Sequence, residues 1–360
     1  MARQKARHAF PAGLNRSLPR IVPITLDPED RMRVTRTTTS AEIKTARRTD
    51  RIAISTPGDF LTFAARPFDG AGGLLPYCLD FVRRRSVYVG GVDAEGAQSA
   101  PFYYLYLRRN ATRVVSVPWE QGALAPGAAR APIFLFSPGR CGSTLLSRLL
   151  SEAGIANVSE PDFYTQATTA ACASPFNPFR RTVAAAAAAM GADLAAALDP
   201  AQPPVVKLRA ESCRAPDLLV RPQERRTIFM TRGFEDWARS NGRAFRNGAQ
   251  KSVRKYLTAM SGYAWTKRNG TCHVIRYERL LADPLAEAAS LARFLARDIS
   301  TEAVAATMKE DSQEGTPLQR GVRPDLPGWE RRFDETMALW NSAKVRRARE
   351  ALGAEELCTG

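Results

Sequence analysis

Histidine, paired cysteines and long apolar runs are scarce in this sequence. Its 360 residues include only two histidines, His8 and His273, and its six cysteines form no C-x-x-C pair and have no histidine at zinc-site spacing. A zinc site is therefore not expected. No stretch reaches the roughly 18 consecutive apolar residues of a membrane span. Residues 1–26 lack the apolar region of a secretory signal, so we predict reduced thiols in a cytoplasmic protein without a membrane span.

Positive charge, by contrast, is in excess. Lysine and arginine number 52 against 36 acidic residues, which gives a formal net charge of +16. This surplus favours anionic partners such as nucleotides, nucleic acid, acidic glycans or a membrane surface, and does not choose among them. Residues 1–50 are rich in Arg, Thr, Pro and Lys. We predict that they form a basic, poorly ordered arm, either a solvated tail or an arm that binds an anionic partner.

Aromatic and β-branched runs follow this arm. They are RSVYVGGV (85–92), FYYLYL (102–107) and TRVVSVPW (112–119), separated by Gly, Asn and polar residues. The pattern is typical of antiparallel strands. We therefore predict a β-rich extension over residues 51–128.

Short apolar runs alternate with helical patterns from residue 129 onward. The runs are IFLF (133–136), PVVKL (204–208), TIFMT (227–231) and CHVIRY (272–277), and helices are expected at 180–198, 250–268 and 284–297. The repeated order of a strand followed by a helix predicts an α/β domain over 129–360 with a central parallel sheet flanked by helices. Ligands of such sheets bind beyond the carboxyl ends of the strands.

The first of these strands ends in a loop suited to anions. SPG (137–139) stops the apolar run, and a helical pattern begins at GST (142–144). Arg140 supplies a cation, small residues allow backbone N–H groups to point at a ligand, and the helix adds its positive dipole end. The Walker pattern fails because Ser143 follows Gly142 where a lysine is required. The loop therefore favours a phosphate or sulfate site and disfavours an ordinary ATPase or kinase.

The segment SPGRCGSTLL (137–146) resembles the 5′-phosphosulfate loop of sulfotransferases, which have a P-loop-like fold and use 3′-phosphoadenosine 5′-phosphosulfate (PAPS) as donor. TIFMTRGFEDWARSNGRAFR (227–246) is similar to the family's 3′-phosphate element, in which a serine follows an arginine by eight residues, as Ser240 follows Arg232. An arginine at a strand end can form two hydrogen bonds to a phosphate. In the loop, the resemblance implies donor contacts from Pro138, Gly139, Arg140, Cys141, Gly142, Ser143 and Thr144, with Cys141 as a small spacer.

Two later segments keep the family's order. CHVIRYERLLADPLAEAASLARFL (272–295) looks like the family's strand, Tyr-Glu-x-Leu, Asp-Pro and helix, which implies that Tyr277 lies near the adenine. SQEGTPLQRGVRPDLPGWERRF (312–333) resembles the late loop over the 3′-phosphate, which implies a donor contact from Arg320, with Arg323 as a competitor.

One position departs from the family's pattern, and one motif in the later segments is structural. Leu145 stands where cytosolic members carry an aromatic residue for adenine, so this contact is expected from Tyr277 or Trp237. Asp283-Pro284 predicts an N-cap followed by proline at the first helical position.

The reaction that the resemblance implies needs cations and a base, and no metal. Sulfuryl transfer moves a charged group in line between two oxygens, so catalysis is positioning, charge stabilisation and proton removal. Arg140 and Lys207, which ends PVVKL, are the candidate cations. Neither histidine is placed to act as the base of the cytosolic members. Glu160, in NVSEPDFY, matches the glutamate of protein-tyrosine and several carbohydrate sulfotransferases, with Glu211 as the rival.

The resemblance thus implies a nucleotide-binding transferase that is closer to bacterial and Golgi-type members with a glutamate base than to cytosolic members with a histidine base. It would move a sulfuryl group from PAPS to a hydroxyl or an amine of an unknown acceptor, with contacts from variable loops at 155–200 and 242–252. One alternative is a nucleotide-dependent kinase with a degenerate loop, which needs an acidic metal ligand where Thr231-Arg232 stand. Another is a non-catalytic binder of anionic polymers on an inactive fold. The oligomeric state stays open.

Overall fold

The computed structural model describes residues 54–358 with short gaps. The gaps are 61–64, 67–68, 71, 126–130, 174–176, 200, 221–225 and 310–324. The predicted arm over 1–50 and the predicted donor contacts Arg320 and Arg323 lie outside the described residues.

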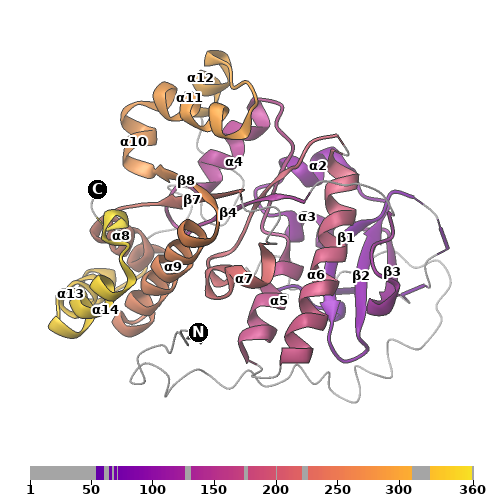
Figure 1. Ribbon diagram of the computed structural model, residues 1–360, viewed down its shortest axis with the longest axis horizontal. Coiled ribbons are helices and arrows are strands. Elements are labelled where there is room, and N and C mark those ends of the chain that lie inside the picture. The colour runs from indigo at the N-terminus through magenta and orange to yellow at the C-terminus, as the bar shows by residue number, and fades with distance from the viewer. Residues whose placement is uncertain are drawn as a thin grey trace, which may run out of the picture.

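A five-stranded sheet lies at the centre of the molecule (Figure 1). Its strands run parallel in the order β5-β6-β4-β7-β8. Their bounds are β4 Ile133–Phe136, β5 Asn157–Ser159, β6 Val205–Lys207, β7 Arg226–Thr231 and β8 Thr271–Arg276. The prediction of an α/β fold with a central parallel sheet is confirmed. Because the strands are parallel, the residues that follow them meet at one edge of the sheet.

Helices cover both faces of this sheet. Ile133 and Leu135 of β4 pack on one face with leucines of α4 and α11, whereas Phe134 and Phe136 pack on the other with α5 and α9. This alternation is that of a strand buried on both sides. The helices are α4 Ser143–Glu152, α5 Asp162–Ala173, α6 Asn177–Leu198, α7 Pro216–Leu219, α8 Phe234–Ala244, α9 Ala249–Asn269, α10 Tyr277–Ala282, α11 Pro284–Leu295, α12 Thr301–Lys309, α13 Trp329–Trp340 and α14 Ala343–Leu352.

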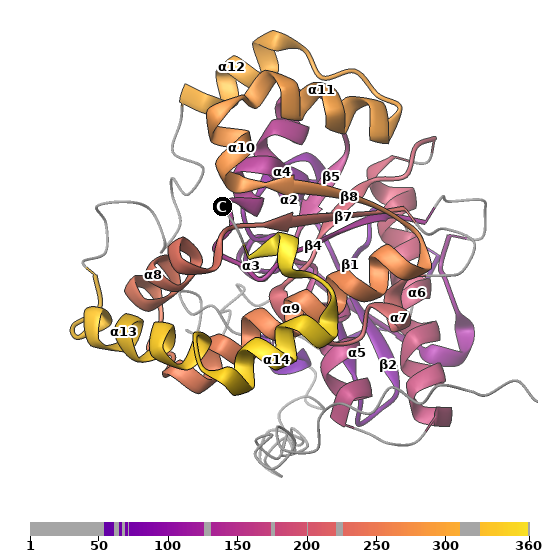
Figure 2. The same ribbon diagram turned by 60° about the vertical axis from the view of Figure 1, so that its left-hand side comes forward.

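The three long helices expected after residue 129 are confirmed as α6, α9 and α11. The start of α11 is also as predicted, since the Asp283 side chain accepts a hydrogen bond from the Ala286 N–H at 3.0 Å and Pro284 occupies the first turn. Both views place α10, α11 and α12 over α4, and α13 beside α8 and α9 (Figure 2).

The predicted β-rich extension contains three antiparallel strands, β1 Leu75–Asp80, β2 Arg85–Gly90 and β3 Arg113–Pro118. Two helices stand between β2 and β3, namely α2 Ala94–Ser99 and α3 Tyr103–Asn110. The strand predicted at 102–107 is therefore wrong. Tyr103, Tyr104, Leu107 and Arg108 are buried at helical spacing, and the Tyr103 hydroxyl donates to the Pro76 carbonyl at 2.8 Å. Burial of this face outweighs the strand propensity of aromatic residues.

The extension shares one core with the α/β domain. Tyr77, Tyr88 and Tyr103 of the extension belong to the same buried cluster as Phe163 of α5 and Met190 of α6. The Tyr88 hydroxyl also donates to Asp193 of α6 at 2.7 Å. The extension is therefore fixed on α5 and α6, which lie between it and the central sheet (Figure 1).

Helix α6 is the one described helix that is long and apolar enough to cross a membrane by length and composition. Its window Pro178–Leu198 has a mean hydropathy of 1.3, and 44% of the window is buried within the protein. Val183, Ala187, Met190 and Leu194 form a buried stripe along it. Such a stripe is typical of a helix that packs on a globular core.

Candidate functional site

The loop between β4 and α4 has the backbone of an anion site. Gly139, Arg140 and Gly142 all have positive φ angles, of 73°, 58° and 83°. Gly142 is the N-cap of α4, and as a glycine it has no side chain to cap the helix. The first turn of α4 thus presents backbone N–H groups at the positive end of the helix dipole, where an anion can bind. Arginine in the left-handed region is strained, which is common at functional sites.

Hydrogen bonds fix this loop to β7 and α8. The Trp237 indole donates to the Gly139 carbonyl at 2.7 Å, and the Cys141 thiol donates to the Met230 carbonyl at 3.4 Å. Burial raises the pKa of the Cys141 thiol. Arg140 Nε donates to Ser240 Oγ at 3.2 Å, which brings together two of the predicted donor contacts.

Trp237 has 0% exposure. The expectation that it contacts adenine is therefore wrong, because its ring is enclosed and its N–H is used by the loop.

Arg232 and Tyr277 meet above the start of α4. The Arg232 guanidinium carbon lies 4.8 Å from the centre of the Tyr277 ring. A Cβ atom on Gly142 would lie 2.2 Å from Tyr277 Cδ2, so the ring also covers this glycine. Arg232 Nε is buried and has no hydrogen-bond partner in the described part of the chain. A buried donor of this kind calls for an acceptor, and an anion beside the helix start would supply one.

Lys207 and Glu160 form a buried pair on the other side of the loop. Lys207 Nζ lies 3.3 Å from Glu160 Oε1 and donates to Thr144 Oγ1 at 3.1 Å. The Lys207 side chain is 3% exposed and that of Glu160 is 16% exposed. The Glu160 N–H donates to the Lys207 carbonyl at 2.7 Å, and Glu160 has a positive φ of 61°. The backbone thus turns sharply to direct this carboxylate at the lysine.

Glu160 is a carboxylate at neutral pH. Burial raises the pKa of its carboxyl, but Lys207 and Arg209 lower it by more, so that the pKa lies below its usual value. Glu211, the rival candidate base, is an exposed residue of the short helix Ala210–Arg214. His273 stacks on Phe294 with 5.0 Å between ring centres, within the face that α11 covers.

Two further cations at the site were missed by the sequence analysis. Arg209 Nε lies 3.2 Å from Glu160 Oε2 and 3.1 Å from Asp162 Oδ1. Its place two residues after Lys207, just past the end of β6, is a signal that could have identified it. Lys255 of α9 lies with its Nζ 3.6 Å from the position that a Cβ on Gly139 would take, and it also lowers the pKa of Glu160. Only the packing of α9 brings it here.

The extension also contributes to the site. The Phe102 ring centre lies 5.7 Å from Lys207 Nζ, and the Tyr104 ring centre lies 4.2 Å from the Arg209 guanidinium carbon. Asp162, which is fully buried, accepts a hydrogen bond from the Ser55 N–H at 2.7 Å. Lys207 and Arg209 therefore pack against residues that precede the α/β domain in the chain.

No group of three or more His, Cys, Asp or Glu residues able to hold a metal is present in the part of the chain that the structure describes. The site is instead built from cations, hydroxyls, backbone N–H groups and one accessible carboxylate, which is chemistry suited to a phosphate or sulfate group.

Comparisons with known proteins give likenesses of structure alone. No protein-family model and no curated protein matches the chain. Retinol dehydratase with androsterone and the inactive cofactor PAP is 16% identical, with a TM-score of 0.36 over 61% of this chain and 80% of that chain. Retinol dehydratase with retinol and PAP is 16% identical, with a TM-score of 0.37 over 66% and 86%. A mouse sulfotransferase with PAP is 16% identical, with a TM-score of 0.33 over 61% and 88%. The α/β assignment of this chain rests on its own strand order and register.

Proposed function

We propose that this protein is a sulfotransferase that uses PAPS as its donor and a hydroxyl compound as its acceptor. One observation carries the proposal: the buried Arg232 Nε lacks a hydrogen-bond partner among the described residues, beside a helix start whose N-cap, Gly142, has no side chain. An anion with two separated charged groups would satisfy both. A carboxylate paired with a lysine then lies on the opposite side of the same loop.

The residues that follow β4 and β7 suit the two charged ends of PAPS. The N–H groups of residues 142–144, together with Arg140, would hold the 5′-phosphosulfate end, and Arg232 with Ser240 would hold the 3′-phosphate. Arginine suits the latter role because its guanidinium forms paired hydrogen bonds to phosphate oxygens. Tyr277 supports this arrangement by packing between Gly142 and Arg232. Since its ring contacts both, it would set the width of the nucleotide site.

The chemistry divides between the donor and three side chains. When bound, the donor supplies a sulfuryl group whose bond to the 5′-phosphate oxygen breaks as sulfur bonds to the acceptor oxygen. Glu160 takes the acceptor's hydroxyl proton, for which its carboxylate state is required. Lys207 and Arg140 offset the negative charge on the transferred oxygens. The products are a sulfate ester and adenosine 3′,5′-bisphosphate, called PAP.

A kinase is the second candidate, and the residues after β7 argue against it. A magnesium-dependent kinase holds its metal through a carboxylate near the phosphates. Thr231 and Arg232 occupy the end of β7 instead, and the Thr231 hydroxyl is directed at Tyr256 and the Leu357 carbonyl. Glu278, a carboxylate beside this strand end, accepts a hydrogen bond from the Gly233 N–H at 3.0 Å.

Calorimetric titration with PAP, with ATP and magnesium, and with a duplex oligonucleotide tests this proposal. We expect wild-type protein to bind PAP, and Arg232→Ala to bind it about 10-fold or more weakly, because a charged hydrogen bond contributes about 1.5–3 kcal/mol. Arg226→Ala is the matched control, since Arg226 is an exposed arginine at the opposite end of β7.

Each alternative has its own result. Preference for ATP over PAP would favour the kinase. Duplex binding that falls steeply with salt and survives Arg232→Ala would favour a non-catalytic binder of anionic polymers. Failure of PAP to bind wild type, or equal binding by Arg232→Ala, would overturn the sulfotransferase proposal.

A further inference from the structure

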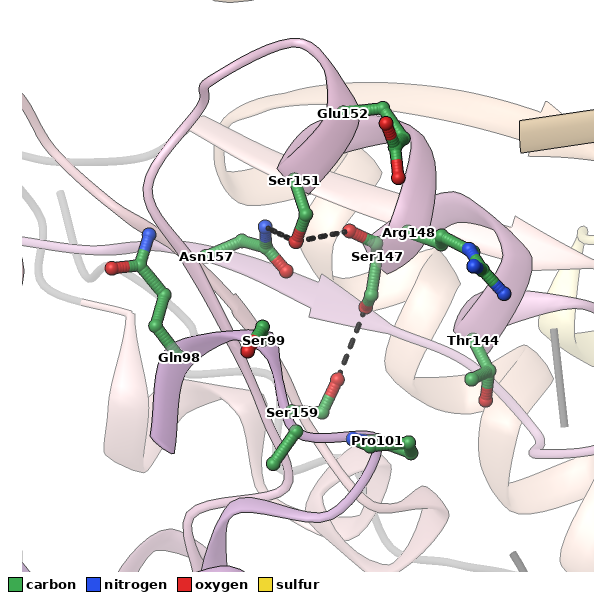
Figure 3. Close-up of a pocket in the computed structure, with 11 residues that line it drawn as sticks. Gln98, Ser99, Pro101, Thr144, Ser147, Arg148, Ser151, Glu152, Asn157 and Ser159 are labelled. Atoms are coloured by element: carbon green, nitrogen blue, oxygen red, sulfur yellow. Dashed lines mark hydrogen bonds between the residues drawn. The ribbon is translucent and has the colours of Figure 1, made fainter. Parts of the chain in front are cut away.

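A polar pocket opens beside α4 (Figure 3). Its volume is about 350 Å³, at the small end of the range for ligand pockets. Its walls come from three places: the end of α2 with the segment that follows it, one side of α4, and strand β5. The first of these walls belongs to the extension, and the other two belong to the α/β domain.

Most residues of the lining carry a group that forms hydrogen bonds, and the carbon atoms of these side chains share the pocket surface with those groups. It carries the hydroxyls of four serines and of Thr144, the amides of Gln98 and Asn157, and the charged groups of Arg148 and Glu152. Its only other members are Ala100 and Pro101. An aromatic or steroidal ligand would strip water from these groups without replacing its hydrogen bonds, which costs free energy. The lining therefore favours a ligand with many hydroxyl groups.

Hydrogen bonds among these groups orient the hydroxyls (Figure 3). Ser159 Oγ donates to Ser147 Oγ at 3.2 Å, Ser151 Oγ donates to the Ser147 carbonyl at 3.2 Å, and Asn157 Nδ2 donates to Ser151 Oγ at 2.9 Å. A hydroxyl has one hydrogen to donate and two lone pairs. Ser151 Oγ thus keeps one lone pair beyond these bonds, and its orientation is fixed before a ligand arrives.

Each of the three walls has a residue that contacts the Lys207–Glu160 pair or is next in the chain to a residue of that contact. Thr144 lines the pocket and also accepts the hydrogen bond from Lys207 Nζ at 3.1 Å. Ser159 lines it, and Glu160 follows directly in the chain. Pro101 lines it, and the next residue, Phe102, has its ring centre 5.7 Å from Lys207 Nζ. A ligand that fills the pocket would therefore have one end at Thr144, whose hydroxyl is joined to Glu160 through Lys207 Nζ.

We infer that this pocket binds the acceptor, and that the acceptor is a small polyhydroxylated compound of the sugar class. The inference rests on the proposed function. One hydroxyl of the sugar lies at the Thr144 end, where it loses its proton to Glu160 as its oxygen bonds to sulfur and the sulfur–oxygen bond to the donor phosphate breaks. The remaining hydroxyls bind the serines and amides. The extension then has a role, since its segment 98–101 forms the wall that selects the acceptor.

The test uses a tryptophan that closes the pocket. Ser99 is exposed at the last position of α2, so Ser99→Trp can fill the opening without entering the core. Ala94→Trp is the matched control, because Ala94 is exposed at the first position of the same helix and does not line the pocket. The probes are the methyl glycosides of glucose, galactose, N-acetylglucosamine and glucuronic acid, with 4-methylumbelliferone as the phenol.

Glycoside binding is measured by calorimetry with PAP present and with PAP absent, and transfer is measured from labelled PAPS. We expect at least one glycoside to bind wild type and to accept the sulfuryl group. Ser99→Trp should raise its Kd and KM about 10-fold or more and leave PAP affinity unchanged, while Ala94→Trp should match wild type.

Two results would overturn this inference: the phenol binds and no glycoside does, or a glycoside binds and Ser99→Trp does not weaken it. If PAP still binds in either case, the proposed function stands. If PAP does not bind, but a glycoside binds wild type and not Ser99→Trp, the result would support the sugar site and overturn the proposed function.

Discussion

Replacing Glu160 by glutamine removes a charge and keeps the shape of the side chain. Glu160 lies 3.3 Å from Lys207 Nζ and 3.2 Å from Arg209 Nε through its two carboxylate oxygens. The amide oxygen of glutamine can still accept a hydrogen bond from Lys207 or Arg209, so the loop and the donor site should keep their structure. What it cannot do is take a proton from the acceptor.

The expected loss of transfer follows from this. A positioned general base contributes about 10²- to 10⁴-fold to a rate, so Glu160→Gln should lower kcat by at least about 10²-fold. PAP affinity should change little, because the carboxylate is paired with Lys207 and Arg209, which are not the proposed contacts of PAP. Since the pKa of Glu160 lies below its usual value, protonation of this base should lower the wild-type rate only at a pH more acidic than that at which an ordinary glutamate titrates.

The assay measures sulfate ester formation from labelled PAPS, with PAP titration in parallel on each variant. Glu211→Gln is the control, because Glu211 is exposed and makes none of these contacts. Unchanged turnover in Glu160→Gln would refute the reasoning. Loss of turnover in Glu211→Gln alone would transfer the role of base to that residue.

Three other changes test the site's construction. Gly142→Ala should abolish PAP binding, because its Cβ would lie 2.2 Å from Tyr277 Cδ2, whereas Gly154→Ala, also at positive φ but with open space around it, should bind PAP normally. Trp237→Phe should lower the free energy of unfolding by about 1–3 kcal/mol in urea, since it leaves the Gly139 carbonyl without its donor. Burial raises the pKa of the Asp162 carboxyl from 3.8 to about 6. When this carboxyl is charged, it should therefore lower the free energy of unfolding by up to about 3 kcal/mol. Stability relative to Asp162→Asn should therefore rise as the pH falls from about 6 to about 4.

These three predictions have clear contrary outcomes. Normal PAP binding by Gly142→Ala would mean that Tyr277 does not define the nucleotide site. A urea midpoint unchanged in Trp237→Phe would show that the loop keeps its position without the indole. A difference between wild type and Asp162→Asn that is constant with pH would mean that Asp162 titrates normally in the folded protein.

Four strands of the sheet, β4, β6, β7 and β8, could be predicted because each is a short apolar run between polar residues, whereas β5, with the sequence Asn-Val-Ser, has no such run and was not predicted. The β4 run, for example, is apolar on both of its faces, and the structure buries both. The residues that follow strands β4 and β7 could be predicted for the same reason, since the end of a strand locates the ligand edge of a parallel sheet.

The rest depends on contacts between distant segments. FYYLYL has strong strand propensity, and it is a helix because its buried face packs on β1 and on the site. Lys255 lies on an amphipathic helix and looks like one of its many solvated cations until α9 is packed against the loop. The contacts of the Phe102 and Tyr104 rings with Lys207 and Arg209 could not be inferred, because their segment was predicted to be a strand.

The strand order β5-β6-β4-β7-β8 has a consequence for how specificity can change. Arg232 and Tyr277, the proposed donor contacts, follow β7 and β8 on one flank of β4, whereas Lys207 ends β6 and Glu160 follows β5 on the other, where β5 also forms one wall of the polar pocket. The loop after β4 lies between the two flanks. We therefore expect substitutions in the pocket wall to change acceptor choice independently of nucleotide affinity, so that one side of the sheet can diversify while the other stays constant.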